Sequence, residues 1–170
     1  GDHLEPAGIL GLGSYTPSRV VTNDELATIV DTSDEWIFTR TGIRERRWAA
    51  ADEFTSDMAT AAAGRALEDA GVTASEIEYV LVATASPDNP FPSTAARVAK
   101  NLGITDRGAV DIAAACSGFI YGLELGAALV NSGTYGKVLV IGAEKLTSIT
   151  NWTDRNTCVL FGDAAGAMVL

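Results

Sequence analysis

The chain has 170 residues, 47% of them hydrophobic and 20% charged, which is typical of a globular protein with a substantial core. Its net charge of −10 argues against a nucleic-acid backbone as the general partner, because that partner requires a broad basic surface. Two cysteines and one histidine are too few for a zinc site or a disulfide framework, and no apolar run reaches the roughly 20 residues of a membrane span. The cysteine content fits a reducing compartment, so we expect a cytoplasmic protein that holds no metal and does not bind a membrane.

Strand and helix patterns alternate along most of the chain. The predicted strands, in chain order, are residues 8–14, 43–49, 79–84, 109–115, 137–142, 158–161 and 164–170. The predicted helices are residues 22–29, 32–40, 54–70, 93–102 and 117–131. Most strands are continuous Val, Ile, Leu and Ala runs, which indicates a sheet covered on both faces. The fold class is therefore predicted as layered α/β with mostly parallel strands, and the last two strands, which no helix separates, allow one antiparallel pair.

The glycines of the first predicted strand resemble the start of a dinucleotide-binding fingerprint. Gly11 and Gly13 have the required spacing, but Thr16 stands where the third glycine of that fingerprint is needed. The sequence therefore argues against a Rossmann-type cofactor site at this strand.

A basic segment stands out in this acidic chain. Four of its twelve cations lie within eight residues, at Arg40, Arg44, Arg46 and Arg47. Such runs usually form a solvated surface, whereas the functional alternative is a local site for a phosphorylated ligand. The residues alone leave both interpretations open.

The stretch 110–122 changes from a strand-type apolar run to a helical pattern, and Cys116 lies at the change. A thiol there would face the free N–H groups of the first helical turn and the positive end of the helix dipole, which favour the nucleophilic thiolate. Small neighbours at 113–118 leave room for a sharp corner and for a substrate. The alternative is a buried structural cysteine, because free cysteines are among the most buried residues. Cys158, within a predicted strand, is assigned to the core.

Four motifs follow one another in a specific order and spacing: DTSDEWI at 31–37, RTGIR at 40–44, DIAAACSGF at 111–119, and TDRNT at 153–157 with FGDAAG at 161–166. Together they resemble β-ketoacyl-acyl-carrier-protein synthase III, the thiolase-fold family of condensing enzymes that initiates bacterial fatty acid synthesis. The resemblance runs from about residue 8 to residue 170. It implies that residues 1–170 form the N-terminal αβα half of a five-layer αβαβα sandwich, with the C-terminal half absent. A chain that stops inside an apolar, strand-type stretch agrees with this expectation.

The resemblance implies a condensing acyltransferase. In the family, the cysteine that matches Cys116 takes the acyl group of acetyl-CoA or another short acyl-CoA. Malonyl-acyl-carrier protein then loses its carboxylate, and its carbanion displaces the acyl group. The histidine and asparagine that support this step belong to the second half, and His3 matches neither of them. The 170 residues are therefore not expected to complete the reaction alone.

The resemblance also implies where acyl-CoA binds, as a substrate rather than as a permanently held cofactor. Trp36 and Arg155 correspond to the pair that sandwiches the adenine ring, and Thr32 corresponds to a polar contact beside it. Arg40 corresponds to a contact with a CoA phosphate or with the carrier protein. An indole face and a guanidinium plane both stack well on a purine, so the pairing is physically sound.

Two further residues are implied to shape the acyl pocket. Phe91 matches a position that reaches across a homodimer interface into the partner's pocket, and Leu146 lines the pocket of its own subunit. Neither residue reveals the preferred acyl chain length.

Two alternatives stay open beside the condensing enzyme of fatty acid synthesis. One is a non-catalytic thiolase-fold subunit that binds an acyl group or CoA. The other is a related condensing enzyme of secondary metabolism with the same first half. An inactive relative would be expected to replace the nucleophile, so the presence of Cys116 in its corner motif favours an enzyme.

Overall fold

The computed structural model describes residues 6–170. The strands are β1 (Gly11–Tyr15), β2 (Arg19–Thr22), β3 (Glu45–Trp48), β4 (Tyr79–Ala83), β5 (Gly108–Ile112), β6 (Val138–Lys145) and β7 (Asp163–Val169). The α-helices are α1 (Asn23–Leu26), α2 (Asp34–Thr41), α3 (Thr55–Ala70), α4 (Thr94–Leu102) and α5 (Gly118–Asn131). Short 3₁₀ turns lie at Ala74–Glu76, Ala115–Ser117 and Leu146–Ser148.

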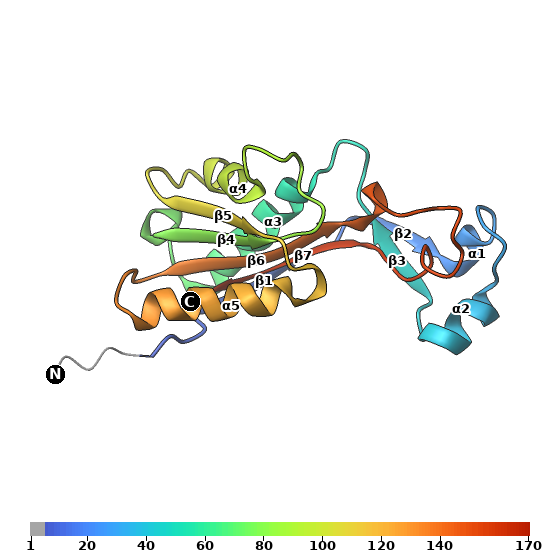
Figure 1. Cartoon of the computed structure of the whole chain (residues 1–170), viewed down its shortest axis with the longest axis horizontal. Coiled ribbons are helices and arrows are strands. Elements are labelled where there is room, and N and C mark those ends of the chain that lie inside the picture. Colours follow the sequence, from blue (N-terminus) through green and yellow to red (C-terminus); the bar gives the residue numbers. More distant parts are fainter. Residues whose placement is uncertain (1–5) are drawn as a thin grey trace.

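The main sheet has five strands in the order β1-β7-β6-β4-β5. Strand β4 pairs in parallel with β5 and β6, whereas β7 runs antiparallel to both β6 and β1. Helices α3 and α4 cover one face of this sheet, and α5 covers the other (Figure 1). The predicted α/β class is therefore confirmed: β1, β4, β5 and β6 run in one direction, β7 runs in the opposite direction, and helices cover both faces.

One predicted strand is wrong. Residues 158–161 form turns, in which the N–H of Cys158 donates to the carbonyl of Asp154 and the N–H of Leu160 to that of Thr157. The side chain of Asp154 accepts from the backbone N–H of Asn156 and from the hydroxyl of Thr157, which stabilises the start of the turns. An apolar run of four residues fits a strand or a buried helical turn equally well. The antiparallel partners of β7 are therefore β6 and β1.

Glycine allows two close contacts between the layers. A Cβ atom at Gly11 would lie 2.5 Å from the carbonyl oxygen of Ala66, so this glycine lets β1 pack directly against α3. On the opposite face, a Cβ atom at Gly126 would lie 2.8 Å from a methyl group of Val140. Packing against α3 therefore explains why residue 11 is a glycine, and no bound dinucleotide is needed to explain it. This agrees with the absence of the third glycine of the dinucleotide-binding fingerprint at Thr16. The outer side of α5 exposes three large apolar side chains, Ile120, Tyr121 and Leu125.

A smaller unit projects from one end of the sandwich, where β2 and β3 form an antiparallel pair beside α1 and α2 (Figure 1). Its core holds Val21, Leu26, Ile37, Cys158 and Val159. The strand β2 is absent from the sequence prediction because it has four residues and polar ends. Between residues 6 and 170, no helix has both the length and the apolar character needed to cross a membrane.

Arg46 is the buried polar centre of this smaller unit. Its guanidinium donates to Asn23 Oδ1 at 2.8 Å, to the carbonyl of Val159 at 3.0 Å and to the carbonyl of Val21 at 3.3 Å. Burial lowers the pKa of Arg46, because removal from water disfavours its charged form. The side chain joins β2, α1 and the loop before β7, so it holds the segments of this unit together.

Candidate active site

Cys116 lies on a sharp connection between β5 and α5. The strand ends at Ile112, three residues earlier than predicted, and Cys116 lies in the 3₁₀ turn that precedes Gly118. Ala115, directly before the thiol, has a φ of +47°. This left-handed conformation costs an alanine on the order of 1–3 kcal/mol, and such strain concentrates at functional sites. Cys116 itself is exposed.

The thiol opens onto an apolar cavity of about 360 Å³. The described residues that line it are Ala83, Ala85, Ala115, Cys116, Phe119, Gly142, Ala143, Glu144, Leu146 and Phe161. These come from the carboxyl ends of β4 and β6, from the start of α5 and from the turn before β7. Ligand sites in open α/β sheets form at the carboxyl ends of parallel strands, so the topology agrees with the cavity.

The cavity unites two of the predicted site residues, and three of its larger side chains are not among the predicted ones. Cys116 and Leu146 line it together, although they are far apart in sequence. Phe119, Glu144 and Phe161 were not selected from the sequence. Phe119 and Phe161 lie within the quoted motifs, and Glu144 follows the apolar part of a predicted parallel strand, which is a position where polar site residues are frequent.

The two cysteines have opposite environments. Cys158 is 1% exposed, and burial is the main reason why its pKa lies above the usual value. A buried thiol with a raised pKa is a poor nucleophile. Of the two cysteines, the exposed Cys116 is therefore the candidate nucleophile.

A second cluster forms around Trp36 on the smaller unit. The guanidinium carbon of Arg40 lies 4.4 Å from the centroid of the Trp36 ring, and that of Arg155 lies 5.8 Å from it. Arg155 also donates to the carboxylate of Asp31 at 3.1 Å. The hydroxyl oxygen of Thr32 is buried and has no hydrogen-bond partner in the part of the chain that the structure describes. The fold thus brings together Trp36, Arg40 and Arg155, which lie on two segments about 120 residues apart.

Phe91 lies away from the cavity of its own chain. Its side chain is 84% exposed on the loop between β4 and α4, and it is not among the lining residues of the cavity. The base of this loop is fixed to α3, because the hydroxyl of Thr55 donates to the carbonyl of Ser86 at 2.7 Å. The structure therefore separates Phe91 from Cys116 and Leu146.

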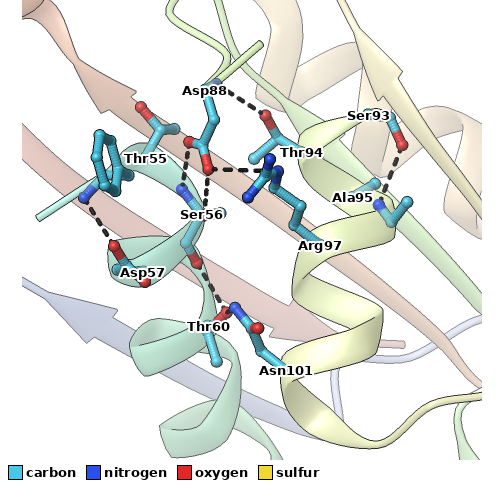
Figure 2. A network of polar contacts seen from close by, with 12 residues as sticks. Thr55, Ser56, Asp57, Thr60, Asp88, Ser93, Thr94, Ala95, Arg97 and Asn101 are labelled. Carbon is cyan, nitrogen blue, oxygen red and sulfur yellow. Dashed lines mark hydrogen bonds and ion pairs between the residues drawn. The ribbon is translucent and has the colours of Figure 1, made fainter. Parts of the chain in front are cut away.

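A polar network holds the end of the same loop (Figure 2). Asp88 accepts from the backbone N–H of Ser56 at 2.9 Å and from its hydroxyl, and Arg97 lies 4.0 Å away. Asp111 accepts from the backbone N–H groups of Thr94 and Ala95, at 2.9 and 2.8 Å, and so caps the start of α4. Phe91 is consequently presented on a well-supported loop.

The described part of the chain offers no candidate metal centre. Between residues 6 and 170, no three or more His, Cys, Asp or Glu residues are grouped so that they could hold an ion. His3 lies outside the described residues.

Comparisons with known proteins give consistent similarities. Residues 110–170 match the family model described as 3-Oxoacyl-[acyl-carrier-protein (ACP)] synthase III. The chain is 57% identical over 164 residues to a β-ketoacyl-[acyl-carrier-protein] synthase III of Geobacillus kaustophilus, a match that covers 96% of this chain and 53% of the relative. The chain thus spans about half the length of the curated relatives it matches.

Two solved structures are similar over nearly the whole chain. The 3-oxoacyl-[acyl-carrier-protein] synthase III of Aquifex aeolicus has a TM-score of 0.93 at 52% identity, covering 95% of this chain and 52% of that one. The priming β-ketosynthase of the R1128 polyketide pathway has a TM-score of 0.92 at 45% identity, covering 95% and 48%. Identities of 52% and 45% mean that the chain resembles these two proteins in sequence as well as in fold.

Proposed function

We propose that this chain, which belongs to the β-ketoacyl-acyl-carrier-protein synthase III family, forms the acyl-accepting part of a condensing acyltransferase. That enzyme would initiate fatty acid synthesis. The observation that carries this proposal is the exposed Cys116 on a strained corner, beside a cavity lined mostly by apolar residues. A thioester intermediate requires this combination of an accessible nucleophile and an apolar space for the acyl group.

The first step is acyl transfer to Cys116. The thiolate attacks the thioester carbonyl of acetyl-CoA or another short acyl-CoA and forms a tetrahedral oxyanion. The intermediate collapses by breaking the bond between carbon and the CoA sulfur, and CoA leaves and takes up a proton. Backbone N–H groups at the corner are suited to stabilise the oxyanion, because they are fixed before the reaction begins.

The second step is decarboxylative condensation. Malonyl-acyl-carrier protein loses CO₂, and the resulting carbanion attacks the acyl carbonyl on Cys116. A carbon–carbon bond forms, the bond to the cysteine sulfur breaks, and the released thiolate takes up a proton. We assign the histidine and asparagine of this step to the part of the protein outside these residues, so the 170-residue segment is not expected to turn over.

We propose that CoA binds at the smaller unit. Trp36 and Arg155 would stack on the adenine, and Thr32 is suited to a polar contact because its hydroxyl has no partner among residues 6–170. Arg40 would contact a phosphate of CoA or the carrier protein. CoA is a substrate here, and no permanently bound cofactor is proposed.

The assembly we propose is a homodimer in the cytoplasm, where the two free cysteines would stay reduced. Phe91 would enter the acyl pocket of the partner, because it is strongly exposed and does not reach its own cavity. Residues 1–170 would be the N-terminal half of the protein. The exposed apolar side chains of α5, Ile120, Tyr121 and Leu125, favour coverage by a C-terminal half.

A second candidate is a priming condensing enzyme of secondary metabolism. The similarity to the R1128 priming ketosynthase favours keeping it, because that match is nearly as good as the match to the Aquifex enzyme. The two candidates differ in the acyl group that Cys116 accepts, so a comparison of acylation rates across acyl-CoA chain lengths separates them. A strong preference for acetyl-CoA supports the fatty acid enzyme, and a preference for longer acyl groups supports the alternative.

The experiment that tests the proposal is acyl labelling of the full-length protein. Radiolabelled acetyl-CoA should label Cys116, and the label should disappear in Cys116→Ser while Cys158→Ala retains it. Label that persists in Cys116→Ser, or that maps to Cys158, would contradict the assignment of the nucleophile.

A further inference from the structure

Glu144 is the one charged residue among the described residues that line the Cys116 cavity. It lies near the end of β6, two residues before Leu146, while the other lining residues are alanines, a glycine, phenylalanines, a leucine and the cysteine itself. Glu144 is half-buried and brings a polar group into an otherwise apolar lining.

The carboxylate of Glu144 acts only as an acceptor. Its Oε1 accepts the backbone N–H of Ala85 at 2.7 Å, and its Oε2 accepts the hydroxyls of Thr84, at 3.3 Å, and Ser86. The Ser86 hydroxyl already accepts the backbone N–H of Lys145 at 2.9 Å, so its proton is directed at Glu144. All three hydrogen bonds end on the two carboxylate oxygens, so Glu144 is the acceptor in each of them.

No cation neutralises this charge within the described residues. None of the ion pairs found between residues 6 and 170 includes Glu144. The neighbouring Lys145 directs its ammonium group elsewhere, to the carbonyls of Ala50 and Glu53 at 2.8 and 2.7 Å. The wall of the cavity therefore carries an uncompensated negative charge.

Glu144 lies at the surface of the cavity. Ala85 lines the cavity, and its backbone N–H is the group that bonds the carboxylate of Glu144. A sphere of the cavity's volume is about 9 Å across, close to the Debye length of about 8 Å at physiological salt. Salt therefore screens only part of the repulsion between Glu144 and a negatively charged acyl group inside the cavity. The apolar walls strengthen this repulsion further.

We propose that Glu144 is a specificity-determining residue that keeps acyl groups with a terminal carboxylate off Cys116. A neutral acyl chain enters an apolar cavity without repulsion. The acyl group of a dicarboxylic monothioester instead places its terminal carboxylate near the carboxylate of Glu144, and the two repel. The inference rests on the proposed function and deepens it. The malonyl thioester bears such a carboxylate, so Glu144 excludes it from the first step and reserves it for the second.

The test compares two acyl donors of similar length on the full-length protein. Butyryl-CoA and succinyl-CoA each form a thioester on Cys116 and release CoA, and succinyl-CoA adds a terminal carboxylate. Single-turnover acylation at saturating donor is followed by intact-protein mass. Glu144→Gln removes the charge at nearly constant shape and should lower the preference for butyryl-CoA about tenfold, because two anions several Å apart repel strongly enough at an effective dielectric near 20.

Two variants distinguish the effect of the Glu144 charge from the effect of its hydrogen bonds on the local structure. Ser86→Ala removes a hydrogen bond but keeps the charge, so it should retain the wild-type preference, as should Glu68→Gln on the exposed side of α3. If Ser86→Ala lowers the preference as much as Glu144→Gln, Glu144 has a structural role and the inference is overturned. An unchanged preference in Glu144→Gln overturns it as well, and normal butyrylation of Cys116 would then leave the proposed function intact.

A measurement on the wild-type protein covers the case in which Glu144→Gln does not fold. The methyl ester of succinyl-CoA has a larger acyl group than succinyl-CoA, but the end of that group is uncharged, and it should acylate Cys116 faster. Equal rates for the ester and the free acid would overturn the inference. If neither donor nor acetyl-CoA acylates Cys116, the proposed function fails and this inference fails with it.

Discussion

The corner around Cys116 and the cluster around Trp36 are built in opposite ways. Cys116 lies on the main sandwich, behind a strained alanine and beside an apolar cavity whose walls come from several packed elements. Trp36 lies on the smaller unit, with exposed arginines near its ring and an exposed ion pair between Arg155 and Asp31. The first arrangement suits a step that requires fixed geometry, and the second suits a ligand that must enter and leave.

The largest expected effect is a loss of acylation at Cys116 with little change in CoA affinity. Cys116→Ser should reduce acylation about a thousandfold or more, because the hydroxyl is a far weaker nucleophile than the thiolate. CoA affinity should stay within about twofold, since the two sites are separate and changes at distant sites are nearly independent. Intact-protein mass and calorimetry measure the two quantities. Equal losses of both would show that the two regions act as one site.

The next change affects the stability of the smaller unit. Arg46→Met removes three hydrogen bonds and leaves Asn23 and two carbonyls without their donor. We expect a loss of about 2–4 kcal/mol in the free energy of unfolding, because hydrogen bonds to a charged group are strong and their orphaned partners stay buried. Chemical denaturation measures it, with the exposed Arg19→Met as a control. A loss no larger than that of the control would show that Arg46 does not hold the unit together.

Removal of the aromatic platform should weaken CoA binding while leaving acylation intact. Trp36→Ala should lower CoA affinity about ten- to a hundredfold, since stacking contributes roughly 1–3 kcal/mol per base. Arg155→Ala should act similarly, and the double variant should lose less than the sum, because both residues contact one ring. The acylation rate at saturating acyl-CoA should change little. Phe38→Ala on the same helix is the matched control, and unchanged CoA affinity in both single variants would remove the cluster from the CoA site.

The smallest expected effect concerns the ion pair between Arg155 and Asp31. Its guanidinium carbon lies 5.8 Å from the Trp36 centroid, less than two stacking distances of about 3.4 Å, so Arg155 must move to admit a purine. Asp31→Asn weakens the exposed ion pair that opposes this movement and should raise CoA affinity about two- to fivefold, the range of a surface salt bridge. Calorimetry measures it, with the exposed Asp24→Asn as control. A weaker affinity in Asp31→Asn would indicate that Asp31 positions Arg155 instead.

Local sequence patterns predict much of the architecture. The capping sequences predict α2, and Gly42 closes it in the expected left-handed conformation. The alanine-rich pattern predicts α3, which ends at Gly71 as expected. These elements are predictable because the periodicity and the end signals of a helix lie within a few residues of one another.

The motifs identify the family and place Cys116 on a corner, since the residues that form the turn adjoin the thiol in the chain. Packing between distant segments accounts for the rest. Residues 158–160 become turns because Cys158 and Val159 pack into the core beside β2 and α2, not into the main sheet. Glu144 becomes part of the cavity only when β4 and β6 align and bring Ala85 to its carboxylate. Such contacts depend on the sheet register and on side chains tens of residues apart, and no local pattern encodes them.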